Sequence, residues 1–267
     1  MFRVGSLLLC LMAAFPLMSQ TPVISNPGVV NSVTLDNSQP IAPGSIVTIF
    51  GSQLASTNAT ADSVPLSTSI SGVSVTFNGV AAAVRLVSPT LISVQTPWET
   101  STTGNASVVV TRNNVPSNAV NVAVAQFSPG IYAIGNLSRS DLALAVNSDG
   151  SLAQPVGIIP GLTSHPAQPD DTLMLLATGL GPVDSAIANG AASSDMVRNA
   201  VTQPQVMVSG IGATVGSAVL SANFVGAYQV QITVPGGVGT SDAAPVKLQI
   251  GGASSPVTTT IATVTPQ

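Results

Sequence analysis

Hydrophobic and polar residues alternate in short runs along most of the chain. The run 72–79 (GVSVTFNG) places Val and Phe at every second position and ends in Asn-Gly, a strong signal for a β-hairpin. Similar runs at 84–87, 91–96, 106–111 and 119–124 are separated by turn residues. No window of helical length carries apolar residues with a period of 3.6. The pattern therefore predicts an all-β protein.

The same strand pattern occurs twice. Residues 40–54 (PIAPGSIVTIFGSQL) and 169–180 (PDDTLMLLATGL) both combine a turn, a β-rich apolar run and a Gly. Pro97 corresponds to Pro235 and Ser117 to Ser255, with a separation of 138 positions in each pair (97 to 235, 117 to 255). The matching strands of the second copy are 205–210, 223–235, 246–250 and 257–262. This repeat predicts two tandem immunoglobulin-like β-sandwiches.

The turn residues and the repeat together divide the chain into four expected parts. We expect a signal peptide at 1–19, a flexible lead at 20–32, one sandwich at 33–127 and a second sandwich at 128–265. The second sandwich begins with a hairpin that contains the Asn-Ser-Asp-Gly turn at 147–150. The linker near 126–130 is short, so we expect a rod with limited bending.

The N-terminal segment has the organisation of a secretory signal. A positively charged start at Arg3 precedes an apolar run at 4–17 that is too short to span a bilayer comfortably, and we expect cleavage after Ser19. An uncleaved anchor or a buried helix is the alternative. Cys10 is the only cysteine and lies in this segment, so the mature chain has neither a disulfide nor a thiolate ligand. We expect a secreted, cell-surface or periplasmic bacterial protein without a membrane span in its mature part.

Composition excludes one class of partner. Hydrophobic residues make up 45% of the chain and charged residues 6%, and the formal net charge is -4. The few basic residues are scattered, so no basic patch neutralises a phosphate backbone. Aromatic residues make up only 3%, which disfavours a stacking platform for single strands. Nucleic acid is therefore not an expected partner.

Six motifs in chain order resemble those of an uncharacterised family of acidobacterial secreted C-terminal domains. They are 43–51 (PGSIVTIFG), 97–99 (PWE), 129–132 (PGIY), 147–152 (NSDGSL), 177–183 (ATGLGPV) and 224–230 (FVGAYQV). Each unit also resembles an IPT/TIG domain, which has an immunoglobulin-like fold. The resemblance implies a fold and export, and it implies no particular activity.

Catalytic and metal-binding patterns are missing from the sequence. His165 is the only histidine and lies in a Pro-rich loop, and the chain has no Gly-x-Ser-x-Gly or Ser-x-x-Lys motif and no His/Cys cluster for zinc. Asp170 and Asp171, together with the turn at 147–150, offer oxygens for a calcium ion, although such residues are more often solvated turn residues. We expect no cofactor, no resident metal and no enzyme activity.

Trp98 and Glu99 are the candidate contacts for a ligand or for the junction between the sandwiches. An exposed Trp beside a carboxylate suits a sugar ring, whereas a buried Trp suits the junction. Because Pro97 corresponds to Pro235, Gly236 takes the place of Trp98 in the second unit, so the sandwich does not require an indole there. We therefore expect Trp98 at the junction.

These observations favour a non-catalytic module for binding, adhesion or structural spacing. Its expected partner is a surface polysaccharide or another secreted protein. The alternative is a secreted carbohydrate-active hydrolase in which Glu99 and an Asp form a carboxylate pair across a cleft.

Overall fold

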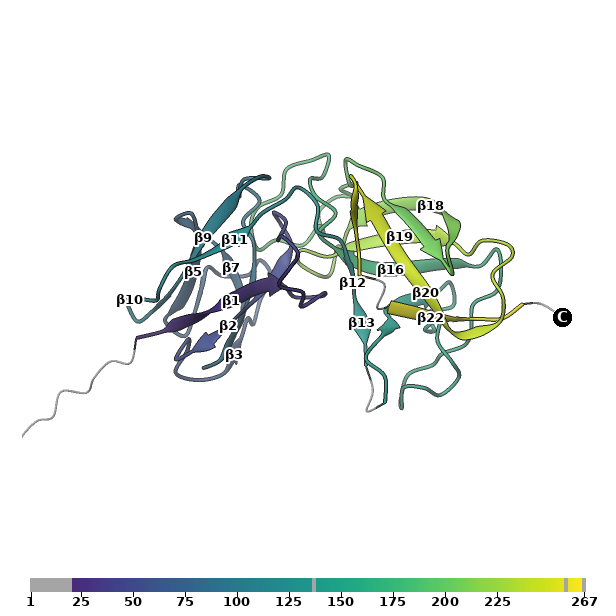
Figure 1. The fold of residues 1–267 in the computed structure, drawn as a ribbon, viewed down its shortest axis with the longest axis horizontal. Helices are drawn as coiled ribbons and strands as arrows, with labels where there is room; N and C mark the ends of the chain where they lie inside the picture. The colour runs from purple at the N-terminus through teal and green to yellow at the C-terminus, as the bar shows by residue number, and fades with distance from the viewer. Residues whose placement is uncertain (1–20, 136–137, 257–258, 266–267) are drawn as a thin grey trace, which may run out of the picture.

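The computed structural model describes residues 21–135, 138–256 and 259–265, and its regular structure is entirely β-strand. Figure 1 shows two β-rich units side by side, the first mainly in purple and blue and the second in teal, green and yellow. The all-β prediction is confirmed, whereas the expected signal peptide lies outside the described residues. None of the described segments forms a helix that would cross a membrane.

The first unit consists of two antiparallel sheets packed face to face. Val73, Val75 and Phe77 occupy alternate positions of one strand and are buried between the sheets, as the sequence pattern predicts. One sheet has the order β1 (Val23–Asn31), β2 (Ile46–Ser52), β8 (Leu91–Gln95), β7 (Ala83–Val87) and β3 (Ala59–Thr60). The other has the order β10 (Val115–Pro116), β9 (Asn105–Arg112), β5 (Val73–Phe77) and β4 (Ser69–Ile70), with β11 (Val120–Ala123) on β9 and β6 (Val80–Ala81) on β5.

The segment 20–32 is not the flexible lead expected from the sequence. Val23–Asn31 forms β1, which pairs with β2 and buries Ile24 and Val29 in the core. Asn118 fixes it further, because its side chain accepts a hydrogen bond from the Ile24 amide and donates one to the Ile24 carbonyl. The Pro-Gly pair at 27–28 suggested a loop, but it falls where the pairing is interrupted between Ile24 and Val29.

The second unit has the same layers, joined by one long strand. β18 (Ile211–Leu220) pairs with β17 (Gln205–Val208) at its start and with β19 (Tyr228–Thr233) along the rest. One layer also contains β12 (Gly130–Ile131), β15 (Ala145–Asn147) and β16 (Thr172–Thr178). The other contains β20 (Ser241–Ile250), β21 (Ala253–Ser254), β22 (Thr259–Thr263), β14 (Leu142–Ala143) and β13 (Ala133–Ile134).

Equivalent serines make the same hydrogen bonds in the two units. Ser117 accepts a hydrogen bond from the Val110 amide through its hydroxyl and donates its own amide to the Val110 carbonyl. Ser255 does the same with Leu248. The separation of 138 positions noted in the sequence therefore marks equivalent positions in the two sandwiches.

The two units also share a β-bulge. In β7 the pairing with β8 shifts between Val84 and Leu86, and in β18 the pairing with β19 shifts between Val215 and Ser217. The partners of these residues are again 138 positions apart (94 to 232, 93 to 231). Arg85 in the first unit and Gly216 in the second are therefore the extra residues of the same bulge.

The second unit has two additions that the first lacks. The connection from β7 to β8 is only residues 88–90, whereas the equivalent connection from β18 to β19 is residues 221–227. The second addition is β13 and β14, which lie between β12 and β15. β12 and β15 pair with β16 in the same way as the two parts of β1 pair with β2. The inserted β13 and β14 therefore occur at the point equivalent to the interruption of β1.

Removal of β1 should destabilise the protein. A chain that starts at residue 32 loses the burial of Ile24 and Val29, so we expect its free energy of unfolding to fall by roughly 3 to 6 kcal/mol. Urea unfolding of this chain and of a chain that starts at residue 21 measures the difference. Equal midpoints and slopes would show that β1 is not part of the folded unit.

Candidate functional site

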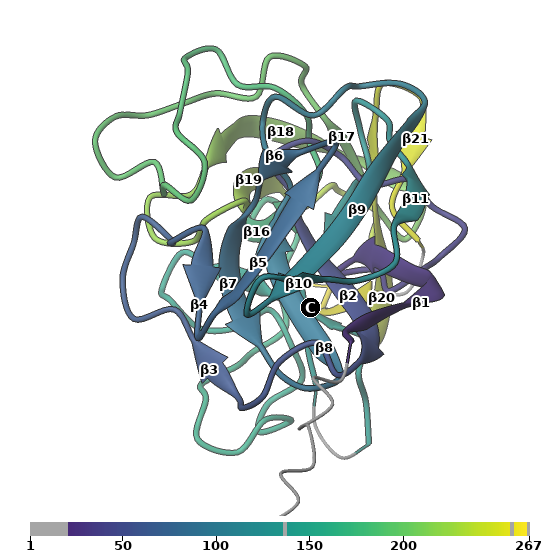
Figure 2. The same ribbon diagram turned by 90° about the vertical axis from the view of Figure 1, so that its left-hand side faces the viewer.

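A turn of the second unit packs onto the first unit. Asn189 and Gly190 lie in the long loop between β16 and β17, which extends over the junction in Figure 1 and beside the first unit in Figure 2. The Gly190 carbonyl accepts a hydrogen bond from the Leu66 amide at 2.8 Å, and its amide donates to Gln95 Oε1 at 2.6 Å. Because Gln95 also donates from Nε2 to the Gly44 carbonyl at 3.2 Å, its fully buried amide joins the two units.

The backbones of the units approach closely beside this amide. Gly226 has φ +69 and lies against the first unit, where a Cβ would come within 2.7 Å of the Gly44 carbonyl and 3.1 Å of Ile46. A larger residue at 226 would separate the units, so this contact requires glycine.

Trp98 and Glu99 both contact the second unit. The Trp98 ring is half-buried, lies over Gly44 and packs against the core of the second unit. Asn189 bridges the two residues, because its Oδ1 accepts from the Trp98 amide at 2.9 Å and its Nδ2 donates to Glu99 Oε2 at 2.8 Å. At Gly236, the position equivalent to Trp98, a Cβ added to the glycine would have no other atom within 4 Å. Trp98 and Glu99 therefore both have contacts to the second unit, and the junction role of Trp98 stays a prediction.

A pocket of about 270 Å³ lies between the units, next to this junction. Its walls are mostly apolar, and three of its side chains carry distinctive chemistry: Arg85, Tyr132 and Phe224. The full lining is Val64, Leu66, Arg85, Tyr132, Leu144, Leu176, Asn223, Phe224, Val225 and Ala227. A shallower hollow of about 630 Å³ shares Val64, Leu66 and Arg85 and continues over the first unit to Thr60, Asp62 and Ser93. We call the two together the interdomain groove.

The groove places a positive charge beside an aromatic hydroxyl. Burial raises the pKa of the Tyr132 hydroxyl, and the positive charge of Arg85 partly offsets that rise. Tyr132 is held by its backbone, which donates to the Leu176 carbonyl and accepts from the Leu144 amide. Phe224, in contrast, is 56% exposed in the loop 221–227.

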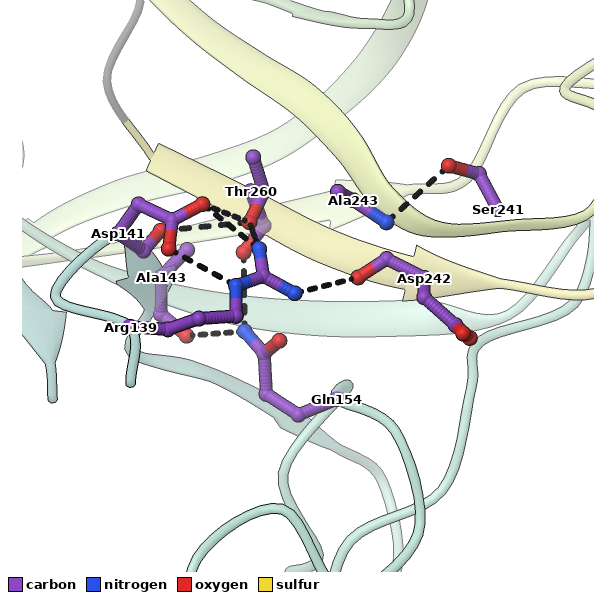
Figure 3. A network of polar contacts seen from close by, with 8 residues as sticks. All are labelled: Arg139, Asp141, Ala143, Gln154, Ser241, Asp242, Ala243 and Thr260. Atoms are coloured by element: carbon purple, nitrogen blue, oxygen red, sulfur yellow. Dashed lines mark hydrogen bonds and ion pairs between the residues drawn. The ribbon is translucent and has the colours of Figure 1, made fainter. Parts of the chain in front are cut away.

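A polar network ties the inserted segment of β13 and β14 to the last strand of the protein (Figure 3). Asp141 forms a two-bond ion pair with Arg139 and accepts a hydrogen bond from the Thr260 hydroxyl at 3.0 Å. The buried Gln154 amide donates to the carbonyls of Ala143 and Thr260, at 2.9 Å each. Arg139 holds the pKa of the Asp141 carboxyl at about 2. The network fixes the segment that begins at Tyr132.

The other polar candidates form local contacts away from the groove. His165 Nε2 lies 3.1 Å from Asp149 Oδ2, and its pKa is raised first by the Pro166 carbonyl and then by Asp149. Asp149 in turn caps the 147–150 turn by accepting from the amide and hydroxyl of Ser151. Asp171 accepts from the Gln168 amide. Over the described ranges, no three His, Cys, Asp or Glu side chains form a group able to hold a metal ion.

The carboxyl groups with shifted pKa values are all stabilised in the charged form. They are Asp36, Asp141, Asp149, Asp184 and Asp195, and in each the largest cause of the lowered pKa is a hydrogen bond from a neighbouring side chain. A general acid in glycoside hydrolysis requires the opposite shift. These five carboxyl groups therefore offer no support for the hydrolase alternative.

Sequence reasoning did not identify the chemistry of the groove. Tyr132 and Phe224 stood within two family motifs, and Arg85 stood within an expected strand. A comparison within the repeat could have identified them. Tyr132 and Phe224 lie in the two additions of the second unit, and Arg85 in the first unit occupies the bulge position that is glycine in the second. Comparison of the two copies position by position would have separated these residues from those that build the sandwich.

Comparison with known families gives a match to the first unit. Residues 29–127 match the IPT/TIG domain model, which confirms the IPT/TIG resemblance for this unit. No curated protein matches the chain significantly.

Three solved structures show low overall similarity. They are the surface glycan-binding protein PbSGBP-B of Prevotella bryantii (9% identity, TM-score 0.26), the plexin A4 extracellular region (12%, 0.27) and the C-terminal domain of the AgI/II polypeptide BspA of Streptococcus agalactiae (10%, 0.20). The alignments cover 88%, 97% and 91% of this chain, and 41%, 20% and 98% of the respective relatives. The chain thus spans less than half of the first two structures. At these scores the likeness carries no information on ligands.

Trp98→Ala should loosen the junction. Loss of the ring contact with the second core should lower the free energy of unfolding by roughly 2 to 3 kcal/mol and broaden the distribution of distances between the units. Because residues 21–267 contain no cysteine, spin labels at Asn121→Cys and Gln205→Cys report that distance by pulsed EPR in a chain that starts at residue 21. Trp98→Phe, which keeps a ring, should have a smaller effect. An unchanged distribution in Trp98→Ala would contradict the junction role.

Asp141→Asn should make stability less dependent on acid. The pKa of Asp141 is about 2 in the folded protein and 3.8 ordinarily, so its ion pair stabilises the fold above pH 4 and the stabilisation is lost as the pH falls toward 2. We expect a shallower fall in unfolding free energy over this range in the variant than in the wild type. Asp62→Asn is the control, since Asp62 makes no ion pair with any described residue. Parallel curves for the wild type and Asp141→Asn would refute the linkage.

Proposed function

We propose that the protein is a non-catalytic, secreted or cell-surface binding module that takes its ligand in the interdomain groove. The observation that carries this proposal is the lining of the groove, which is formed by side chains of both units. A binding surface of this kind requires the two units to keep one relative position. The buried Gln95 amide and the Asn189 contacts provide that constraint.

Phe224 supports the location of the site. A phenylalanine that is 56% exposed leaves apolar surface in water, and its loop 221–227 is an addition that the sandwich does not need. Aromatic side chains beside a concave apolar wall are typical of ligand sites. Phe224 is therefore the residue from which we expect a ligand to gain the most contact.

The extent of the groove favours an elongated ligand. The pocket at Phe224 continues past Arg85 into the shallower hollow with Thr60, Asp62 and Ser93. A saccharide chain fits this alternation of an apolar pocket and hydroxyl-bearing side chains, since sugar rings pack on aromatic rings and their hydroxyls form hydrogen bonds. We therefore propose a surface polysaccharide as the partner, ahead of another secreted protein. We further propose that the chain is a member of the acidobacterial secreted C-terminal domain family.

Phe224→Ala should weaken ligand binding with little effect on the fold. Loss of most of an aromatic contact area should reduce affinity about tenfold or more. A glycan array with the wild-type protein identifies the best saccharide, and calorimetric titration of that saccharide measures the loss.

Phe50→Ala is the matched control for this substitution. Phe50 is 37% exposed and occupies in β2 the position that Leu176 has in β16, but it does not line the interdomain groove. We expect it to bind the saccharide as the wild type does. If Phe224→Ala and Phe50→Ala bound equally well, the groove would not be the site.

A further inference from the structure

Arg85 carries a charge that the fold does not require. It is the extra residue of the bulge in β7, and the same bulge in β18 contains Gly216, which has no side chain. The bulge itself therefore forms without an arginine. Bulges are known to turn a side chain toward a site, and here the arginine lines both parts of the interdomain groove.

The guanidinium of Arg85 has no partner within the described part of the chain. Two other arginines are engaged: Arg139 is paired with Asp141, and Arg198 is paired with Asp195. Asp62 lies in the adjoining hollow, yet it forms no ion pair with Arg85. An arginine with five donors and no protein acceptor is available to bind an anion.

The surroundings of Arg85 strengthen such an interaction. The pocket places Val64, Leu66, Leu144 and Leu176 around it, and Arg85 is the only charged residue of the pocket lining. Arg85 is exposed to solvent, so these walls reduce the screening of an ion pair there only on the side that faces them. The net charge of -4 on the whole chain does not oppose it, since charges more than about 8 to 10 Å away are largely screened at physiological salt.

On this basis, and on the proposed function, we propose that the groove selects a saccharide whose sugar units bear a carboxylate or a sulfate. Arg85 binds the anionic group, and Phe224 packs against the ring. The planar fork of the guanidinium matches both carboxylate and sulfate oxygens, which accept two parallel hydrogen bonds. Tyr132, on the same wall, adds the face of its ring to the same sugar unit.

A series of polymers built on galactose tests this selectivity. The probes are oligogalacturonate with free carboxylates, the same oligomer with methyl-esterified carboxylates, a neutral galactan oligomer of equal length and a sulfated galactan oligomer. We expect the free acid or the sulfated oligomer to bind at least tenfold more tightly than the neutral and esterified ones. Binding of the anionic probe should also weaken as the salt concentration rises.

Two variants with the same change in charge assign the effect to one residue. Arg85→Met should reduce affinity for the anionic probe by about tenfold to a hundredfold and leave binding of the neutral probe unchanged. Lys247→Met removes one positive charge from β20, outside the groove, and should bind as the wild type does. Arg85→Lys should restore affinity only in part, because an ammonium lacks the fork.

The outcomes separate this inference from the proposed function. If neutral saccharides bind best in a manner that depends on Phe224, and Arg85→Met has no effect, the groove is the site but the anionic selectivity is wrong. If no saccharide binding depends on Phe224, the proposed function fails as well. Equal losses in Arg85→Met and Lys247→Met, or equally tight binding of polyglutamate that is independent of Phe224, would indicate non-specific charge attraction and overturn the inference.

Discussion

The buried amide of Gln95 is the contact on which the arrangement of the two units depends. It donates to a carbonyl of its own unit and accepts from an amide of the other, and it has no access to water. A buried amide that loses one partner costs more than the bond contributes when made, because the orphaned atom remains desolvated. The junction therefore has one favourable arrangement, in which Gly190 meets Gln95 and Gly226 meets Gly44.

The interdomain groove follows from that arrangement. Its walls come from segments far apart in the chain, and the separate units have no equivalent hollow with Arg85, Tyr132 and Phe224 together. Trp98 and Asn189 act on the junction from another part of its perimeter, where ring packing and two hydrogen bonds resist a hinge motion. The proposed ligand site and the orientation of the two units are thus linked, since a change in orientation alters the separation of Arg85 and Phe224.

The sequence was sufficient to predict the layers of β-strands, but it was not sufficient to predict the interdomain groove. Strict alternation at Val73, Val75 and Phe77, and the repeated positions of Ser117 and Ser255, predicted strands and a duplicated sandwich because these depend on local periodicity. β1 was missed because a Pro-Gly pair reads locally as a loop, whereas the strand is stabilised by pairing with β2 and by Asn118. The groove brings together residues whose proximity depends on the angle between units, and no local pattern contains that angle.

The shared bulge has a further consequence for how such a protein can change. The same bulge forms with arginine in one unit and with glycine in the other. Its backbone conformation therefore does not depend on the size or the charge of the side chain at this position. Recognition chemistry can therefore diversify at this position while the hydrophobic interior stays constant. The two copies can thus differ in side chain at this position while they keep the same pairing of strands.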